Sequence, residues 1–145
     1  MLRLSRKADY ALIALKHLAQ RGQTDSLSAA DIAGSYGIST PLLAKVLQRL
    51  AKKGLVVARH GSSGGYTLAR DPATITALDV VEAIDGPMSI TSCMTRRGDC
   101  DHLANCTVRD PLQRVNETVL EVLQQVTLSQ LADEEPAPPV VGLRP

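Results

Sequence analysis

Apolar residues recur at helical spacing in three consecutive segments at the start of the chain, residues 5–20, 28–37 and 39–54. In the third segment the apolar positions lie three, four and seven residues from the first of them, which places them on one face of a helix: Leu43, Val46, Leu47 and Leu50. Residues that favour helix ends mark the boundaries. The starts are Ser5, Ser28 with Asp31, and Ser39 or Thr40 with Pro41, and the ends are Gly22, Gly37 and Gly54.

The residues between the second and third segments fit a helix-turn-helix. Ala33 is small enough for two helices to cross closely, Gly37 can adopt a left-handed turn, and Ile38 can fill the gap between the helices. Two short strands follow at residues 55–59 and 66–69, joined by a Gly/Ser-rich turn. This hairpin predicts a wing. A phosphate-binding loop is disfavoured because no Lys-Ser/Thr pair follows the glycines.

Beyond the wing, Thr76 is a candidate N-cap for a short helix that ends before Pro87 and buries Leu78, Val81 and Ile84. Regular spacing stops at residues 88–107, which are polar and rich in turn residues. Residues 108–131 then predict a single long helix. Its apolar seam, spaced alternately by three and four, favours a second helix as partner, although packing on its own domain stays open: Leu112, Val115, Val119, Val122 and Val126.

Charge and composition change this picture. The chain has 145 residues and a formal net charge of +1, but residues 1–70 carry eleven Lys/Arg and three Asp/Glu, whereas residues 71–145 carry five and twelve. Phosphate contacts need such local positive charge. With no Phe or Trp the core must be aliphatic, and no apolar run approaches the roughly 18 residues of a membrane helix. The start lacks a signal-peptide core, so we expect a cytoplasmic protein.

The third helix and the wing therefore predict a DNA-binding head. Base contacts are expected from the outward face of the helix, at Thr40, Lys45, Gln48 and Arg49, with Ser39 and Pro41 positioning its start. Wing contacts are expected from Arg59, His60, Ser62 and Ser63, and phosphate contacts from Lys52 and Lys53.

All three cysteines, Cys93, Cys100 and Cys106, lie in the irregular segment. Disulfides are disfavoured in a cytoplasmic chain, which leaves metal binding or thiol chemistry. Structural zinc sites commonly pair cysteines two to four residues apart, whereas here the separations are six and five residues. The spacing favours a larger iron–sulfur cluster, and zinc or a metal-free thiol sensor stays open.

Taken together, these features resemble the IscR/NsrR-type winged-helix regulators of bacteria. The resemblance covers residues 1–131 and rests on LRLSRKADYAL, ADIAGSYGISTPLLAKVLQRLAKKGLV, GSSGGYTLAR, LDVVEAIDGP and the three-cysteine loop. The stretch CTVRDPLQRVNETVLEVLQQVTLSQLA is most similar to regulators of SUF-type iron–sulfur cluster assembly. The resemblance implies a homodimer that binds palindromic operators and whose cluster occupancy changes DNA affinity or choice of site.

Three cysteines leave a four-ligand cluster one ligand short. IscR-like members use a His three residues after the third cysteine, but here that position is Arg109, which as a cation cannot ligate. NsrR-like members supply a carboxylate from the first helix of the partner subunit, and the resemblance places Asp9 there. Competing ligands are His102, Asp99, Asp101 and Asp110. A 2Fe-2S and a 4Fe-4S cluster both stay open. Family wings also carry Arg directly before the turn glycine, where this chain has His60.

The expected fold class is mainly α: a winged helix-turn-helix with a two-stranded wing and a long C-terminal dimerisation helix. Its expected parts are the DNA-binding head at 1–75, the cluster-binding loop and dimerisation helix at 76–131, and a disordered tail at 132–145, acidic and then proline-rich. The expected partners are double-stranded operator DNA and a second copy, with no membrane and no small-molecule substrate.

The predicted function is a repressor that senses cluster, redox or nitric oxide status and controls cluster-assembly genes. A nitric oxide-responsive repressor and a metal-free thiol-based repressor are the alternatives. An enzyme is disfavoured because neither a nucleophile–base pair nor a paired-carboxylate motif is evident. A protein–protein adaptor would leave the basic outward face of the third helix unexplained.

Overall fold

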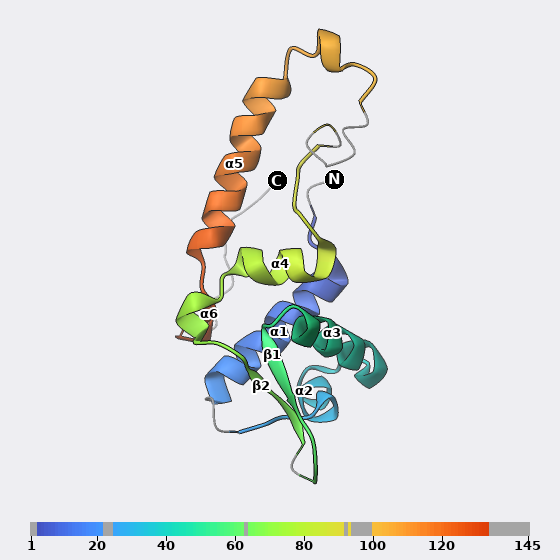
Figure 1. Ribbon diagram of the computed structural model, residues 1–145, viewed down its shortest axis with the longest axis vertical. Helices are drawn as coiled ribbons and strands as arrows, with labels where there is room; N and C mark the ends of the chain where they lie inside the picture. Colours follow the sequence, from blue (N-terminus) through green and yellow to red (C-terminus); the bar gives the residue numbers. More distant parts are fainter. Residues whose placement is uncertain (1–2, 22–24, 63, 92, 94–99, 134–145) are drawn as a thin grey trace, which may run out of the picture.

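The computed structural model describes residues 3–21, 25–62, 64–91, 93 and 100–133, and it is mainly helical with one two-stranded antiparallel sheet (Figure 1). None of the helices in these ranges is both long and apolar enough to cross a membrane. The elements are α1 (Arg6–Arg21), α2 (Ala29–Tyr36), α3 (Thr40–Lys52), β1 (Val56–Arg59), β2 (Gly65–Leu68), η1 (Pro72–Thr74), α4 (Ala77–Asp85), η3 (Leu103–Asn105), α5 (Arg109–Gln125) and α6 (Leu128–Asp133). The predicted fold class is confirmed.

The helix-turn-helix forms as its local sequence predicts. Ser28 Oγ accepts a hydrogen bond from the Asp31 backbone N–H at 3.1 Å, and the Asp31 carboxylate accepts one from the Ser28 N–H at 3.1 Å. These bonds lower the pKa of Asp31. Gly37 ends α2 in the left-handed conformation with φ 64°, and the Ile38 N–H donates to the Ala33 carbonyl at 3.0 Å. The two helices α2 and α3 are therefore joined by a tight glycine-dependent turn.

The core beneath the head is aliphatic, as the composition predicts. The predicted stripe of α3 is fully confirmed, since its buried residues are Leu43, Val46, Leu47 and Leu50. They pack with the buried face of α1, which consists of Ala8, Ala11, Ala14, Leu15 and Leu18. One detail differs: Ser39 occupies the N-cap position of α3 without a side-chain cap bond, so the helix start relies on the Leu43 N–H donating to the Ser39 carbonyl.

The wing is tied to the head by a third extended segment. The pairing of β1 with β2 runs from Val56 opposite Leu68 to Arg59 opposite Gly65. The end of β1 is as predicted, whereas its start and both ends of β2 differ from the prediction by one residue. At the outer side of β2, the Leu27 N–H donates to the Tyr66 carbonyl at 3.1 Å and the Tyr66 N–H donates to the Leu27 carbonyl at 2.7 Å. The segment before α2 thus continues the sheet.

Thr67 is the polar residue that this arrangement buries. Its side chain is 6% exposed and its Oγ1 has no hydrogen-bond partner among the described residues. A buried hydroxyl without a partner costs free energy. Replacing Thr67 with the isosteric valine is therefore expected to leave the free energy of unfolding unchanged or to raise it by up to about 1 kcal/mol, measured by urea denaturation.

The control is Thr67→Ala, which removes the hydroxyl but also leaves a cavity and is expected to destabilise the fold. A clear loss of stability in Thr67→Val would mean that the hydroxyl has a partner in solution.

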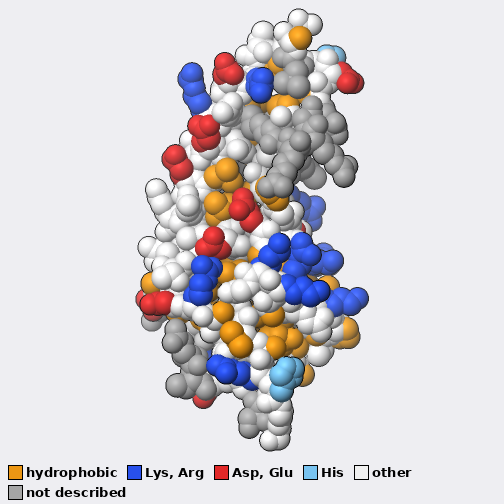
Figure 2. Space-filling model, in the orientation of Figure 1, with side chains coloured by type: hydrophobic (Ala, Val, Ile, Leu, Met, Phe, Trp, Pro, Cys, Tyr) orange, Lys and Arg blue, Asp and Glu red, His pale blue; other side chains and the backbone are white. Residues whose placement is uncertain are grey.

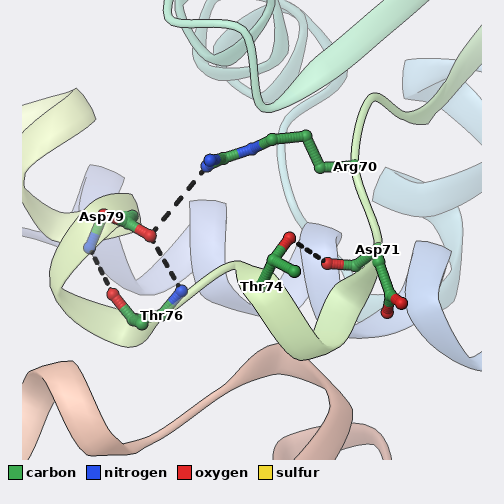
Figure 3. Close-up of polar contacts among 5 residues, drawn as sticks. All are labelled: Arg70, Asp71, Thr74, Thr76 and Asp79. Carbon is green, nitrogen blue, oxygen red and sulfur yellow. Dashed lines mark hydrogen bonds and ion pairs between the residues drawn. The ribbon is translucent and has the colours of Figure 1, made fainter.

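Helix α4 begins at a second capping box (Figure 3). Thr76 Oγ1 accepts from the Asp79 N–H at 3.1 Å and Asp79 accepts from the Thr76 N–H at 3.0 Å. Arg70 lies 3.9 Å from the same carboxylate, and Asp71 accepts from the Thr74 hydroxyl through its backbone carbonyl at 2.7 Å. The predicted inward residues Val81 and Ile84 are buried, whereas Leu78 is half-buried and the additional buried positions are Ala77, Val80 and Ala83.

The predicted single helix at 108–131 is wrong in one respect, because it is broken at Val126 and Thr127 into α5 and α6. The break is stabilised by pairing with the segment before α4. The Ala77 N–H donates to the Val126 carbonyl at 2.8 Å and the Leu128 N–H donates to the Ile75 carbonyl at 2.9 Å. Helix α6 then packs on α1, so the last described residues return to the head. The predicted disordered tail falls almost wholly on residues 134–145, outside the described part.

Helix α5 projects away from the head along the long axis of the molecule (Figure 1). Four of the five predicted seam residues lie on it, with Val115 50% and Val122 55% exposed and Leu112 and Val119 half-buried, whereas Val126 lies in the break after α5. An exposed row of aliphatic side chains at this spacing is typical of a helix that packs against another helix.

Candidate nucleic-acid interface and cysteine loop

The outward face of α3 is basic. Figure 2 shows Lys and Arg side chains gathered over the α3 side of the molecule. The predicted contact residues on this face are all exposed, and they are Ser39, Thr40, Pro41, Lys45, Gln48 and Arg49. No acidic residue occurs in α3, so the face offers only positive charge and neutral hydrogen-bonding groups.

A groove of about 410 Å³ runs along this face between α1, α3 and α4. It is lined by Lys7, Lys45, Val46, Gln48, Arg49, Lys52 and Ile84. Four of the seven side chains are cationic and none is acidic. Lys7 was not among the predicted contact residues, because DNA contacts were expected only from the third helix and the wing. The basic start of the chain, Arg3, Arg6 and Lys7, was the available signal.

Unlike the other polar residues that line the groove, Arg49 forms a hydrogen bond with a backbone carbonyl of another helix. Its Nε donates a hydrogen bond of 2.9 Å to the Ala83 carbonyl in α4. The prediction gave Arg49 a role in reading bases, and in the structure one of its donors is used inside the protein instead. Only the terminal guanidinium nitrogens remain as donors for an external partner.

The wing residues lie at the far end of the molecule from α5 (Figure 1). Arg59 ends β1, and His60 and Ser62 follow in the turn, all three exposed. Ser63 lies outside the described residues. The wing therefore presents two side chains of different kinds, a guanidinium and an imidazole, where the family pattern has a single Arg before the glycine.

The three cysteines are each half-buried, and none forms a disulfide with another described residue. Thr91 Oγ1 lies 3.1 Å from Cys93 Sγ, within hydrogen-bond distance. Three thiols on one loop fit the soft donors of an iron–sulfur cluster in chemistry. In the described part of the chain, however, no three His, Cys, Asp or Glu side chains are grouped closely enough to hold a metal ion, so binding would require the loop to draw together.

The candidate fourth ligands are placed as follows. Asp9 is exposed in the first turn of α1. Asp101 and His102 precede η3, and Asp110 lies in the first turn of α5, all exposed. Asp99 lies outside the described residues. The structure gives no carboxylate or imidazole a place beside all three thiols within the described part of one chain.

Comparison with known proteins assigns the chain to a family. A family model described as Rrf2, iron-dependent transcriptional regulator, matches residues 4–134. The chain belongs to the Rrf2 family. Its relatives include the HTH-type transcriptional regulator IscR of Klebsiella pneumoniae (strain 342), which is 31% identical over 134 residues, 92% of this chain and 82% of that protein.

Solved structures agree with this assignment to the Rrf2 family. CymR, the global cysteine regulator of B. subtilis, superimposes with a TM-score of 0.75 at 30% identity and covers 91% of this chain and 97% of its own. T. potens IscR gives a TM-score of 0.71 at 28% identity, with 90% and 85% covered. The relatives are named transcriptional regulators and not enzymes, and this Rrf2 chain is a DNA-binding transcriptional regulator.

Replacing Lys7 tests whether the groove of this Rrf2 regulator binds DNA phosphates. If Lys7 contacts a phosphate, Lys7→Gln is expected to weaken binding to all DNA sequences alike and to reduce the slope of log affinity against log salt by about 0.9. Fluorescence anisotropy between roughly 50 and 200 mM salt measures both quantities.

Arg114→Gln is the matched control, since it removes one exposed charge from α5, away from the groove. An unchanged salt slope in Lys7→Gln, or an equal reduction in Arg114→Gln, would exclude a specific phosphate contact at Lys7.

Proposed function

We propose that this Rrf2 regulator is a homodimeric repressor whose affinity for operator DNA depends on an iron–sulfur cluster held by Cys93, Cys100 and Cys106. One observation carries the proposal: three thiols lie on a single loop that directly follows α4, and α4 packs on the recognition helix α3. The family description as iron-dependent supports iron as the metal.

We assign a separate role to each of the two parts of the chain that the sequence predicts. The head, residues 1–75, binds the major groove through α3 and a neighbouring minor groove through the wing. Residues 76–131 carry the cysteine loop and α5. The bases are read by Thr40, Lys45 and Gln48, while Lys7 and Lys52 hold phosphates on either side of the groove.

The exposed seam of α5 supports a dimer. Val115 and Val122 lie one above the other on this helix and would be covered by the same helix of a second copy. Two heads joined in this way bind two half-sites of a palindrome, whose separation is fixed by the DNA helical repeat. A change in the angle between the heads therefore changes affinity.

The proposed cluster ligands are the three cysteines, with Asp9 of the partner subunit as the fourth. When bound, the cluster supplies a cross-link of the loop that oxidants, nitric oxide or iron shortage can remove. The chain's own residues then order the loop against α4 and α5. By resemblance to the SUF-type regulators, the proposed target genes are those of cluster assembly, and the exposed carboxylate at Asp9 favours nitric oxide response as the second candidate.

Anaerobic purification followed by iron and acid-labile sulfide assays and a visible spectrum tests the cluster. We expect iron and sulfide in matching amounts, both lost in Cys93→Ala. His102→Ala is the matched control in the same loop and is expected to keep the cluster. Loss of iron in His102→Ala would transfer the fourth-ligand role from Asp9 to His102.

A metal-free thiol repressor with the same head is the second candidate function. The contact between Thr91 and Cys93, together with the separated placement of the three cysteines, favours it. A colourless, iron-free protein after anaerobic purification would support this candidate, or zinc, and would leave the DNA-binding head unchanged.

A further inference from the structure

The last turn of α4 has a hydrogen-bonding defect that the sequence imposes. In an α-helix the Ala83 carbonyl would accept from the backbone N–H four residues later. That residue is Pro87, which has no N–H. The neighbouring Glu82 carbonyl is satisfied normally by the Gly86 N–H at 2.9 Å. The Ala83 carbonyl therefore needs a donor from outside α4.

Arg49 of the recognition helix supplies that donor. Its Nε donates to the Ala83 carbonyl at 2.9 Å in a part-buried position. A cationic side chain at the C-terminal end of a helix also interacts favourably with the helix dipole. Arg49 thus caps α4 from α3, and Arg49 and Ile84 together form part of the basic groove.

The capped turn leads directly into the cysteine loop. The Met88 N–H donates to the Glu82 carboxylate at 3.5 Å, and the Ile90 N–H donates to Asn116 Oδ1 in α5 at 3.0 Å. Thr91, the next residue, contacts Cys93 Sγ at 3.1 Å. Separate hydrogen bonds therefore hold the chain at intervals from Ala83 to Cys93, and the covalent backbone joins them between the end of α4, which contacts α3 through Arg49, and Cys93.

We propose that Arg49 is a positioning residue that transmits the state of the cysteine loop to the DNA-binding groove. This inference rests on the proposed sensing role of the loop, but not on which metal or thiol chemistry the loop uses. When the segment after Pro87 shifts, the last turn of α4 shifts with it, and Arg49 moves the last turn of α3 relative to Lys7 across the groove. Arg49 acts through α4 and is not primarily a reader of bases.

The test compares operator affinity with and without a maleimide adduct on Cys93, in a Cys100→Ser, Cys106→Ser background. The DNA is a duplex selected from a random-sequence pool by the unmodified protein. With Arg49 present, the adduct is expected to weaken binding by about fivefold or more, the lower range of allosteric couplings. In Arg49→Met, which has a similar length but no donor, the adduct is expected to change affinity by less than about twofold.

Lys52→Met is the matched control, because Lys52 lines the same groove from the same helix. It is expected to lower affinity as Arg49→Met does, through loss of one charge, while the effect of the adduct stays at about fivefold. An adduct effect of equal size in Arg49→Met, or no adduct effect with Arg49 present, overturns the proposal.

The outcome is separable from that of the proposed function. If the protein contains no iron but the effect of the adduct still depends on Arg49, the proposed cluster is wrong and the role of Arg49 stands. If the protein carries a cluster but the effect of the adduct does not depend on Arg49, the proposed cluster stands and the role of Arg49 is wrong. A changed sequence preference in Arg49→Met with unchanged coupling would return Arg49 to base reading.

Discussion

Replacing Gly65 with alanine is expected to destabilise the fold by about 2–3 kcal/mol and to lower the Tm by on the order of 10 °C. A Cβ at this position would lie 2.5 Å from the backbone carbonyl carbon and oxygen of Leu27 and 2.8 Å from the Ser28 N. Backbone atoms cannot move aside as the end of a side chain can. The two hydrogen bonds between Leu27 and Tyr66 would therefore be lost or strained.

Gly34→Ala is the matched control for this prediction. Gly34 lies exposed in α2, and an added Cβ would meet nothing within 4 Å. Alanine is the better helix former, so the same chemical change is expected to raise stability by about 0.5–1 kcal/mol. Thermal denaturation of both variants gives the comparison. A Gly65→Ala variant as stable as the parent would mean that Leu27 and β2 are not paired in solution.

The Gly65→Ala change is expected to weaken DNA binding as well as stability. The bridge between Leu27 and Tyr66 holds the wing against the segment that enters α2. Without it the hairpin keeps its own pairing and its packing on α1 and α3, but it loses the backbone bonds on the outer side of β2. Wing contacts from Arg59 and His60 should weaken more than contacts from α3.

Features governed by local rules could be predicted from the sequence. The capping boxes at Ser28 and Thr76, the left-handed Gly37 and the buried stripe of α3 each depend on residues within one or two helical turns. Periodicity and capping chemistry determine such features directly. The helical boundaries were accordingly correct to within one or two residues in α1, α2 and α3.

Features that depend on distant partners could not be predicted in this way. The break between α5 and α6 is set by pairing with residues some fifty positions earlier, at Ile75 and Ala77. Arg49 was assigned to DNA because the sequence does not show that it lies beside the Ala83 carbonyl, which Pro87 leaves without a backbone donor. Lys7 joins the groove only because α1 crosses behind α3. In each case the deciding contact is tertiary.

Val122→Glu is expected to dissociate the proposed dimer and to weaken binding to a palindromic duplex by about a thousandfold or more. The Val122 side chain is 55% exposed in one chain, so glutamate there does not disturb the fold of the protomer. In a dimer built on α5, each of the two chains would contribute this position to the interface. The two glutamate carboxylates would then be buried there without a cationic partner. Each head would then bind its half-site alone.

Gln124→Glu is the matched control, because it adds the same charge to an exposed position on the opposite side of α5. Sedimentation velocity is expected to give a dimer for the parent and Gln124→Glu and a monomer for Val122→Glu, with equal affinity of all three for a single half-site. The apolar groove of about 310 Å³ beside Val122, lined also by Leu4, Met88, Val119 and Leu123, extends the surface available to the partner. A Val122→Glu protein that remains dimeric would place the dimer contact elsewhere, and α5 would then serve only to hold the cysteine loop.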